Sequence, residues 1–214
     1  MFLNLGFNLF IYIIFFILFI FVFINLYLFL FYKNLYFKKR YRNYYYQKIY
    51  RYVLNNDYLL INNFKHNYGK KDEIYIDHII FGKKYIYLIY DNYYFGCLHG
   101  KIDDNYLLFY AANSKTSVVN NPIKKSLDIS KNFKKYYNLD SNLVKTIVLF
   151  NNDCLLEIKD ESFNKTSKDY IKINNVYLIK SLKEFENSNI SDINQEEILK
   201  TCHCIAKESE NWWK

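Results

Sequence analysis

Two short stretches of the sequence carry side chains able to do chemistry, Cys202-His203-Cys204 and Ile76-Asp77-His78. The cysteine run suggests a metal cluster at first sight. Zinc knuckles, however, space their cysteines as Cys-x-x-Cys and add a second pair of ligands. Adjacent positions of a helix also point about 100° apart, so these three side chains do not close on one ion. We therefore expect the run to be structural.

The remaining histidines and cysteines form no catalytic set that the sequence reveals. His78 lies in an apolar strand pattern, which favours packing or hydrogen bonding over proton transfer. His99 shares a strand face with Cys97, but two ligands do not make a structural zinc site. His66 falls in a polar stretch that we expect to be a loop. The sequence shows no Ser-His-Asp arrangement, no phosphate-binding Gly loop and no heptad repeat.

The elements that must position Asp77 are strands followed by helices. Apolar or alternating runs predict strands at 58–62, 73–81, 85–90, 106–112, 144–150 and 176–179, with turns at 82–84 and 92–96. Asn121-Pro122 predicts a helix start, with Asn as N-cap and Pro at the first helical position, and this helix runs to about 137. Ser191 starts a last helix that reaches about 208. This order predicts an α/β domain with a mixed sheet and helices packed on it.

The ordered set Ile76-Asp77-His78, Asn92-Tyr93, Gly96 and Asn121-Pro122 resembles the NERD (nuclease-related) domain, a branch of the PD-(D/E)xK nuclease-like group. The resemblance covers roughly 45–155 and implies a restriction-endonuclease-like fold. It also implies metal-assisted phosphodiester hydrolysis, in which two carboxylates hold Mg²⁺ and a lysine stabilises the developing charge. In this family an Ile-Asp-His strand is followed by a strand that ends in Glu-x-Lys-Asn.

The sequence departs from that pattern at the positions on which hydrolysis depends. Counted back from Asn92, Glu-x-Lys falls on Ile89-Tyr90-Asp91, so the Glu is Ile and the Lys is Asp. The Gly-Glu signature of the family's first helix is absent, and Lys125 stands where the family often has Gln. Of the metal site that the resemblance implies, only Asp77 remains. The degenerate motif predicts a domain without nuclease activity and without a cofactor.

One alternative keeps an active site. Residues two apart in a strand share a face, so Asp91 lies on the face that position 89 occupies. Asp77 and Asp91 would then be the catalytic pair, with Asp77 as a Mg²⁺ ligand. A displaced lysine, Lys83, Lys84 or Lys101, would replace the lost one. The opposite interpretation is that Asp77 is satisfied by hydrogen bonds and that Asp91 opens a turn.

The N-terminal segment 1–32 contains no charged side chain and predicts a transmembrane anchor. Residues 9–31 form a helix about 35 Å long at ~1.5 Å per residue, enough to cross a hydrocarbon core about 30 Å thick. A cleaved signal peptide would have a basic start, a shorter apolar run and small residues at the cut site, and these are absent. A lipoprotein would have a cysteine at the end of the run.

The flanking charges predict the orientation of the anchor. Residues 33–51 carry seven of the 29 basic residues and no acidic one, whereas 52–214 carry 22 basic and 21 acidic residues. The positive-inside rule then places the N-terminus outside and the domain in the cytoplasm, where thiols are reduced. Contacts to anionic lipid headgroups or nucleic acid are assigned to the basic segment, at Lys38, Lys39, Arg40 and Arg42.

The sequence thus predicts an anchor over 1–32, a basic juxtamembrane helix over 33–55 and a NERD-like domain over 56–214 at the cell membrane. The expected function is binding of nucleic acid or of a protein whose identity the sequence does not give. Two alternatives stand beside it, a divergent metal-dependent nuclease using Asp77 and Asp91, and a structural membrane protein with a partner. The near-neutral charge of 52–214 argues against strong nonspecific DNA binding by the domain alone.

Overall fold

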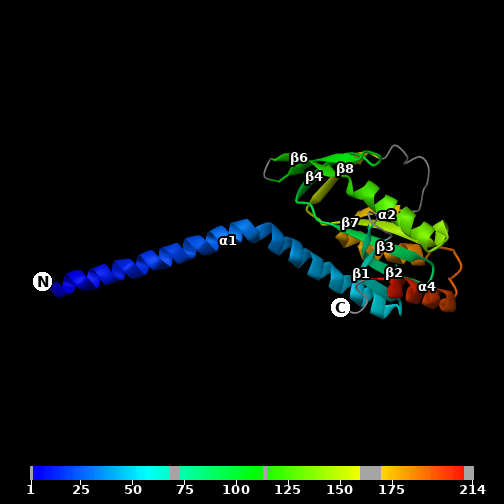
Figure 1. Cartoon of the computed structure of the whole chain (residues 1–214), viewed down its shortest axis with the longest axis horizontal. Helices are drawn as coiled ribbons and strands as arrows, with labels where there is room; N and C mark the ends of the chain where they lie inside the picture. Colours follow the sequence, from blue (N-terminus) through cyan, green and yellow to red (C-terminus); the bar gives the residue numbers. More distant parts are fainter. Residues whose placement is uncertain (1, 68–72, 113–114, 160–169, 210–214) are drawn as a thin grey trace. The chain divides into compact units, whose positions relative to one another are not determined.

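The computed structural model describes residues 2–67, 73–112, 115–159 and 170–209 (Figure 1). The chain divides into two compact units, Met1–Tyr44 and Tyr45–Lys214. Helix α1 (Phe2–Asn55) runs through the first unit and into the second. The prediction that 33–55 continues as a helix is therefore confirmed.

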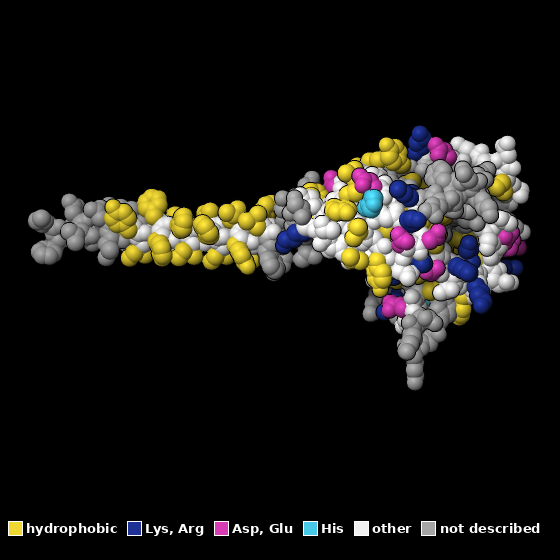
Figure 2. Space-filling view, turned by 90° about the horizontal axis from the view of Figure 1, so that it is seen from above, with side chains coloured by type: hydrophobic (Ala, Val, Ile, Leu, Met, Phe, Trp, Pro, Cys, Tyr) yellow, Lys and Arg dark blue, Asp and Glu magenta, His cyan; other side chains and the backbone are white. Residues whose placement is uncertain are grey.

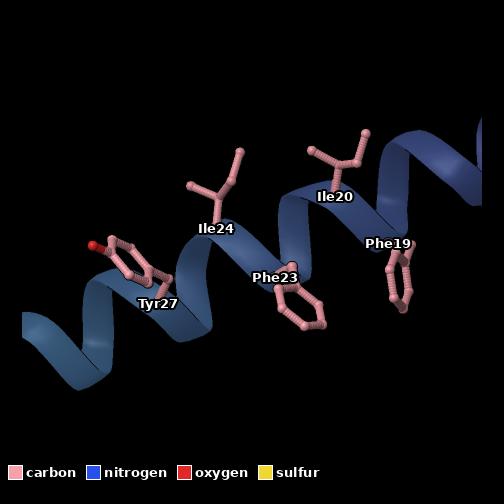
Figure 3. Close-up of a pocket in the computed structure, with 5 residues that line it drawn as sticks. All are labelled: Phe19, Ile20, Phe23, Ile24 and Tyr27. Carbon is pink, nitrogen blue, oxygen red and sulfur yellow. The ribbon is translucent and has the colours of Figure 1, made fainter.

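The first unit contains one helical stretch, Tyr12–Leu30, that is long and apolar enough to cross a membrane. Its side chains are exposed, and its one strongly polar residue is satisfied locally, since the Asn25 amide donates to the Phe21 carbonyl at 2.7 Å. A shallow groove on this stretch is lined only by apolar and aromatic side chains (Figure 3), namely Phe19, Ile20, Phe23, Ile24 and Tyr27. The surface of the helix thus has the chemistry of a segment surrounded by lipid, although a signal sequence has the same composition.

The second unit contains two mixed sheets. The first has the order β1-β2-β3-β7-β9, in which β1, β2 and β3 are antiparallel neighbours and β3, β7 and β9 run parallel. The second has the order β6-β5-β4-β8, with only the β4–β8 pair parallel. Strands of the first sheet are Leu59–Asn67, Glu73–Phe81, Ile86–Asn92, Val144–Phe150 and Tyr170–Asn174. Strands β4, β5, β6 and β8 are Gly96–Lys101, Tyr106–Ala111, Thr116–Asn120 and Cys154–Lys159.

Helices cover both faces of the first sheet. On one face, Phe133 of α2 (Pro122–Tyr136) and Ile205 of α4 (Gln195–Glu208) join the hydrophobic cluster that holds Phe81 and Leu88. On the other face, α3 (Leu178–Glu186) packs Phe185 against Tyr87, and the C-terminal part of α1 packs against β2. Two 3₁₀ turns, Ser141–Leu143 and Asn175–Tyr177, precede β7 and α3.

The start of α2 shows why Asn-Pro is needed at that point. The Asn121 side-chain oxygen accepts from the amides of Ile123 and Lys124, as predicted for an N-cap. Its amide group also donates to the carbonyls of Ile102 and Asp104, at 2.8 and 2.9 Å, in the β4–β5 connection. Asn121 is buried, so one side chain caps the helix and fixes the hairpin of the second sheet.

Several sequence predictions are corrected. The mixed α/β class is confirmed, but the strands form two sheets rather than one, and β4, β6, β8 and β9 were not predicted. The segment 176–179 is a 3₁₀ turn leading into α3 rather than a strand, because Leu178 and Leu182 bury one face of a helix. His66 lies in β1, paired with Ile74, rather than in a loop. The last helix begins at Gln195 with Asn194 as its N-cap, not at Ser191.

Candidate functional site

Asp77 lies on β2, at the place where the pairing of β2 with β3 ends. His78 is the last β2 residue directly opposite β3, and beyond it the Asp77 carboxylate accepts the amide hydrogen of Asp91 at 2.8 Å. Asp77 is only 7% exposed. The carboxylate therefore takes the place of a ladder carbonyl, and a charged acceptor makes such a hydrogen bond stronger than a neutral one.

The regular alternation of β1 and β2 is interrupted near Asp77. The β2 residues that enter the hydrophobic cluster change from Ile74 and Ile76 to Ile79 and Phe81, so the alternation of buried side chains shifts by one position. On the neighbouring strand, Asn63 has a φ of +51°, a left-handed conformation that Asn tolerates better than most residues. This local distortion turns the Asp77 side chain toward the end of β3.

Tyr90 is a β3 residue whose ionisation is affected by the charge of Asp77. Its hydroxyl lies 2.9 Å from Ser130 Oγ of α2, and its ring belongs to the buried cluster. Burial raises the pKa of the Tyr90 phenol above its usual 10.0, the Ser130 hydrogen bond lowers it, and the charge of Asp77 raises it further. The group beside the carboxylate is therefore a neutral phenol at physiological pH.

The register of β2 and β3 corrects the predicted placement of Ile89. Ile89 lies opposite His78 and is fully buried, on the sheet face that α1 covers. His78 Nδ1 lies 2.5 Å from the Asn62 side-chain oxygen, which accepts, and Nε2 lies 3.2 Å from the Tyr45 hydroxyl. His78 is thus a buried hydrogen-bonding residue, as predicted, and Tyr90 rather than Ile89 stands beside Asp77.

The parallel strands end in polar residues close to Asp91. Asp91 pairs with Leu149, and the following residue, Asn92, accepts from the Asn151 amide at 3.3 Å. Asn151 is 1% exposed, and its side-chain oxygen accepts from the Tyr94 amide at 2.8 Å. Sequence reasoning missed Asn151, although its place directly after a buried strand was a signal. These amides shape the turn that leads from the first sheet to the second.

The lysines considered as replacements lie away from Asp77 and Asp91. Lys83 and Lys84 form the β2–β3 turn, where their amides donate to the Glu186 carboxylate at 3.1 and 3.3 Å. That turn is at the opposite end of β3 from Asp91, about 20 Å away at ~3.3 Å per residue. Lys101 lies at the last position of β4, in the second sheet.

The cysteine and histidine candidates remain dispersed in the part of the chain that the structure describes. Cys202 and Cys204 lie on α4, and no three His, Cys, Asp or Glu side chains among the described residues form a group suited to a metal ion. His99 Nδ1 lies 3.5 Å from Glu157, the residue beside it on β8. Burial and the charge of Glu157 raise the pKa of Cys97, which opposes formation of a reactive thiolate.

The basic residues assigned to lipid or nucleic acid lie on α1. Lys38 and Lys39 are exposed, Arg42 is partly exposed, and the side chain of Arg40 lies outside the described part of the chain. No acidic residue lies between Lys33 and Arg51 to neutralise them.

The fold that carries Asp77 is of the mixed α/β class. An antiparallel three-strand meander is followed by three strands of a second sheet, then by a helix, and then by a strand that runs parallel to the last strand of the meander. The family model described as nuclease-related domain, NERD, matches residues 36–151, which are 116 of the 214 residues, and the chain belongs to this family. Neither the search of curated proteins nor that of solved structures found a match. Asp77, Tyr90, Asp91 and Ser130 lie within the matched region, whereas β9, α3 and α4 lie after it.

Proposed function

We propose that this protein is a membrane-anchored NERD domain that binds nucleic acid through its phosphates without cleaving it. The N-terminus lies outside the membrane and the domain lies in the cytoplasm. The absence of hydrolysis is proposed from one observation, the hydrogen bond that the Asp91 amide donates to the Asp77 carboxylate. Through this bond the one remaining acidic residue of the family's site holds two strands together.

The surroundings of Asp77 support this assignment. A metal site of this family needs a second carboxylate beside the first and a lysine next to it. The neighbour of Asp77 is instead the phenol of Tyr90, which burial keeps neutral and whose hydroxyl is paired with Ser130. Ile89 is fully buried opposite His78, on the other face of the first sheet from Tyr90. These contacts are those of a packed strand end.

Binding is assigned to the outer surface of α2. Within the helix, five lysines accompany a single acidic residue, Asp128. Lys124 is engaged with the Asn105 side chain at 2.7 Å, but four others make no ion pair or hydrogen bond with any described residue. These four, named the α2 lysines, are Lys125, Lys131, Lys134 and Lys135. They form a cationic surface about 15 Å long, at ~1.5 Å per residue, on a domain whose overall net charge is close to zero.

Two ligand classes fit a cationic helix, nucleic acid and anionic lipid, and the spacing favours nucleic acid. Phosphates of a single strand recur every few ångströms along the backbone, so a row of lysines meets several phosphates at once and releases their counterions. The basic segment at Lys38, Lys39, Arg40 and Arg42 then serves the lipid headgroups.

The test uses the full chain in lipid nanodiscs of neutral phospholipid, with fluorescence anisotropy of labelled single- and double-stranded DNA and RNA. Changing the four α2 lysines to Gln should weaken binding and reduce the dependence of log K on log salt by about three to four, since each phosphate contact contributes ~0.7–0.9 to that slope. A matched control changes four exposed lysines of α3 and α4, Lys180, Lys183, Lys200 and Lys207, and should bind as the wild type does. Equal loss in both variants would contradict a dedicated α2 surface.

A divergent nuclease is the second candidate, because Asp77 and Asp91 are in contact through the Asp91 backbone. Incubation of the same samples with Mg²⁺ or Mn²⁺ distinguishes the two proposals. No cleavage supports binding alone. Cleavage that disappears in Asp77→Ala, while that variant stays folded, would establish a rearranged metal site and overturn the proposal.

A further inference from the structure

The second sheet has one face that no described segment covers. Its inner face packs Leu98, Leu107 and Ile158 against Ile123 of α2 and Phe150 of β7. The opposite face, named the open face, carries five large side chains that are 39–65% exposed: Tyr106, Leu108, Tyr110, Val118 and Leu155. Viewed from above, Figure 2 shows hydrophobic side chains at the surface of the folded part beside acidic residues and a histidine.

The register joins these side chains into one continuous surface. Val118 of β6 pairs with Leu108 of β5, which pairs with His99 of β4. Tyr110 pairs with Cys97, and Cys97 pairs with Leu155 of β8. Directly paired residues lie on the same face of a sheet, so the exposed apolar surface crosses all four strands.

The ionisable groups of the open face are of both signs. His99 lies beside Glu157 at 3.5 Å, and Lys101 pairs with Lys159 at one end of the surface. Two lysines and one carboxylate therefore occupy these strand positions, and Asp103 and Asp104 follow Lys101 in the β4–β5 connection. Tyrosine, aliphatic and lysine side chains together are the composition of a surface that lies in the headgroup region of a bilayer.

We infer that the open face docks on the anionic surface of the membrane in which α1 is anchored, with Leu108 and Val118 in the headgroup–acyl boundary and Lys101 and Lys159 at lipid phosphates. The inference rests on the proposed anchoring. Once the helix is inserted, the folded unit cannot diffuse away, so a surface of modest intrinsic affinity is occupied at the high effective concentration that a tether gives. We therefore assign the bilayer, rather than a separate protein partner, as the surface that covers the open face.

The test places a single tryptophan at chosen positions of the full chain, after Trp212 and Trp213 are changed to Phe. The protein is reconstituted in vesicles of phosphatidylcholine with phosphatidylglycerol, and brominated lipids serve as quenchers. Val118→Trp and Leu108→Trp should show blue-shifted emission and quenching by lipids brominated near the headgroup. Leu199→Trp, at an exposed position of α4, is the matched control and should respond only to aqueous quenchers.

Ile20→Trp reports on the anchor independently and should be quenched by lipids brominated deep in the acyl chain. If Ile20→Trp is quenched and both open-face tryptophans are not, docking is overturned while anchoring stands. If Ile20→Trp is not quenched, anchoring itself fails. Shielding of Val118→Trp that depends on protein concentration and not on brominated lipid would assign the open face to a second copy and overturn the inference. Docking that is lost in Lys101→Glu/Lys159→Glu and in vesicles of phosphatidylcholine alone confirms the role of charge.

Discussion

Substitution of Asp77 separates a structural carboxylate from a metal ligand, because the two roles predict stability changes of opposite sign. Asp77→Ala removes the acceptor of the 2.8 Å bond from the Asp91 amide and leaves that amide without this partner at a partly buried position. A hydrogen bond to a charged group contributes about 1.5–3 kcal/mol. Because Asp91 is only partly buried, we expect the free energy of unfolding to fall by about 1.5–3 kcal/mol in Asp77→Ala. Asp77→Asn keeps a neutral acceptor and should lose about 1 kcal/mol.

These losses are measurable in a folded unit that spans Tyr45–Lys214, or 170 residues. For a domain of that size, 1 kcal/mol shifts the Tm by about 2–4 °C. Near-ultraviolet circular dichroism of the full chain in detergent, at pH 7 and without divalent ions, follows the transition through its many tyrosines. Asp128→Asn, on the exposed surface of α2, serves as the matched control and should leave the Tm unchanged.

A metal-binding pair would give the reverse result. Two carboxylates held together for an ion repel each other in its absence, so neutralising one of them would raise the Tm of the apoprotein. Added Mg²⁺ would then raise the Tm of the wild type and not that of Asp77→Asn. A higher Tm for Asp77→Asn, together with this Mg²⁺ effect, would refute the assignment of Asp77 to the strand pairing.

Three further predictions concern groups away from Asp77. The Glu186 carboxylate accepts from the Tyr87 hydroxyl at 2.6 Å and from the β2–β3 turn, so Glu186→Gln should lower the free energy of unfolding by about 2–3 kcal/mol in denaturant titrations. Burial raises the pKa of Tyr87 and Tyr90, so their contribution to the free energy of unfolding is complete below pH 10 and is lost as the pH rises above it. In denaturant unfolding measured between pH 8 and 11, the free energy of unfolding should therefore decline less steeply in Tyr90→Phe than in the wild type. Burial raises the pKa of Cys154 to about 12, whereas Cys204 is exposed, so Cys204→Ser should abolish the fast phase of thiol labelling at pH 8 and Cys154→Ser should preserve it.

The sequence predicted best those elements whose burial is uniform. The bounds of β2 and β7 match the predicted 73–81 and 144–150, because long apolar runs end there in polar or turn-forming residues. Asn121-Pro122 fixed the start of α2 for a local reason, since both the cap and the first helical position depend on residue type alone. Such signals lie within a few residues of each other and do not need tertiary contacts.

The elements that were missed owe their structure to partners distant in sequence. Strands β6 and β8 are short and only partly buried, so they show little hydrophobic periodicity, and their pairing with β5 and β4 decides their form. The apolar run at 176–179 fits a strand or a helix equally well over four residues. It is helical from Leu178 because Leu182 and Phe185, further along, complete a face that packs on the sheet.

The candidate site was predicted in part, for the same reason. Asp77 was found from its motif, but the strand register, which no local pattern specifies, decides that its neighbour is Tyr90 and not Ile89. A shift of one residue moves every side chain to the other face of a sheet. The hydrogen bond between Asp77 and the Asp91 amide and the positive φ of Asn63 are likewise tertiary features that no local sequence pattern predicts.

Helix α1 extends across the boundary between the two compact units. The helix that contains the apolar stretch also places Tyr45 and Ile49, both almost fully buried, in the core of the second unit. The Tyr45 hydroxyl contacts His78, and His78 lies next to Asp77 on β2. No Pro or Gly lies in α1 after Gly6. The core of the folded unit therefore includes side chains from the C-terminal part of the same helix that carries the apolar stretch.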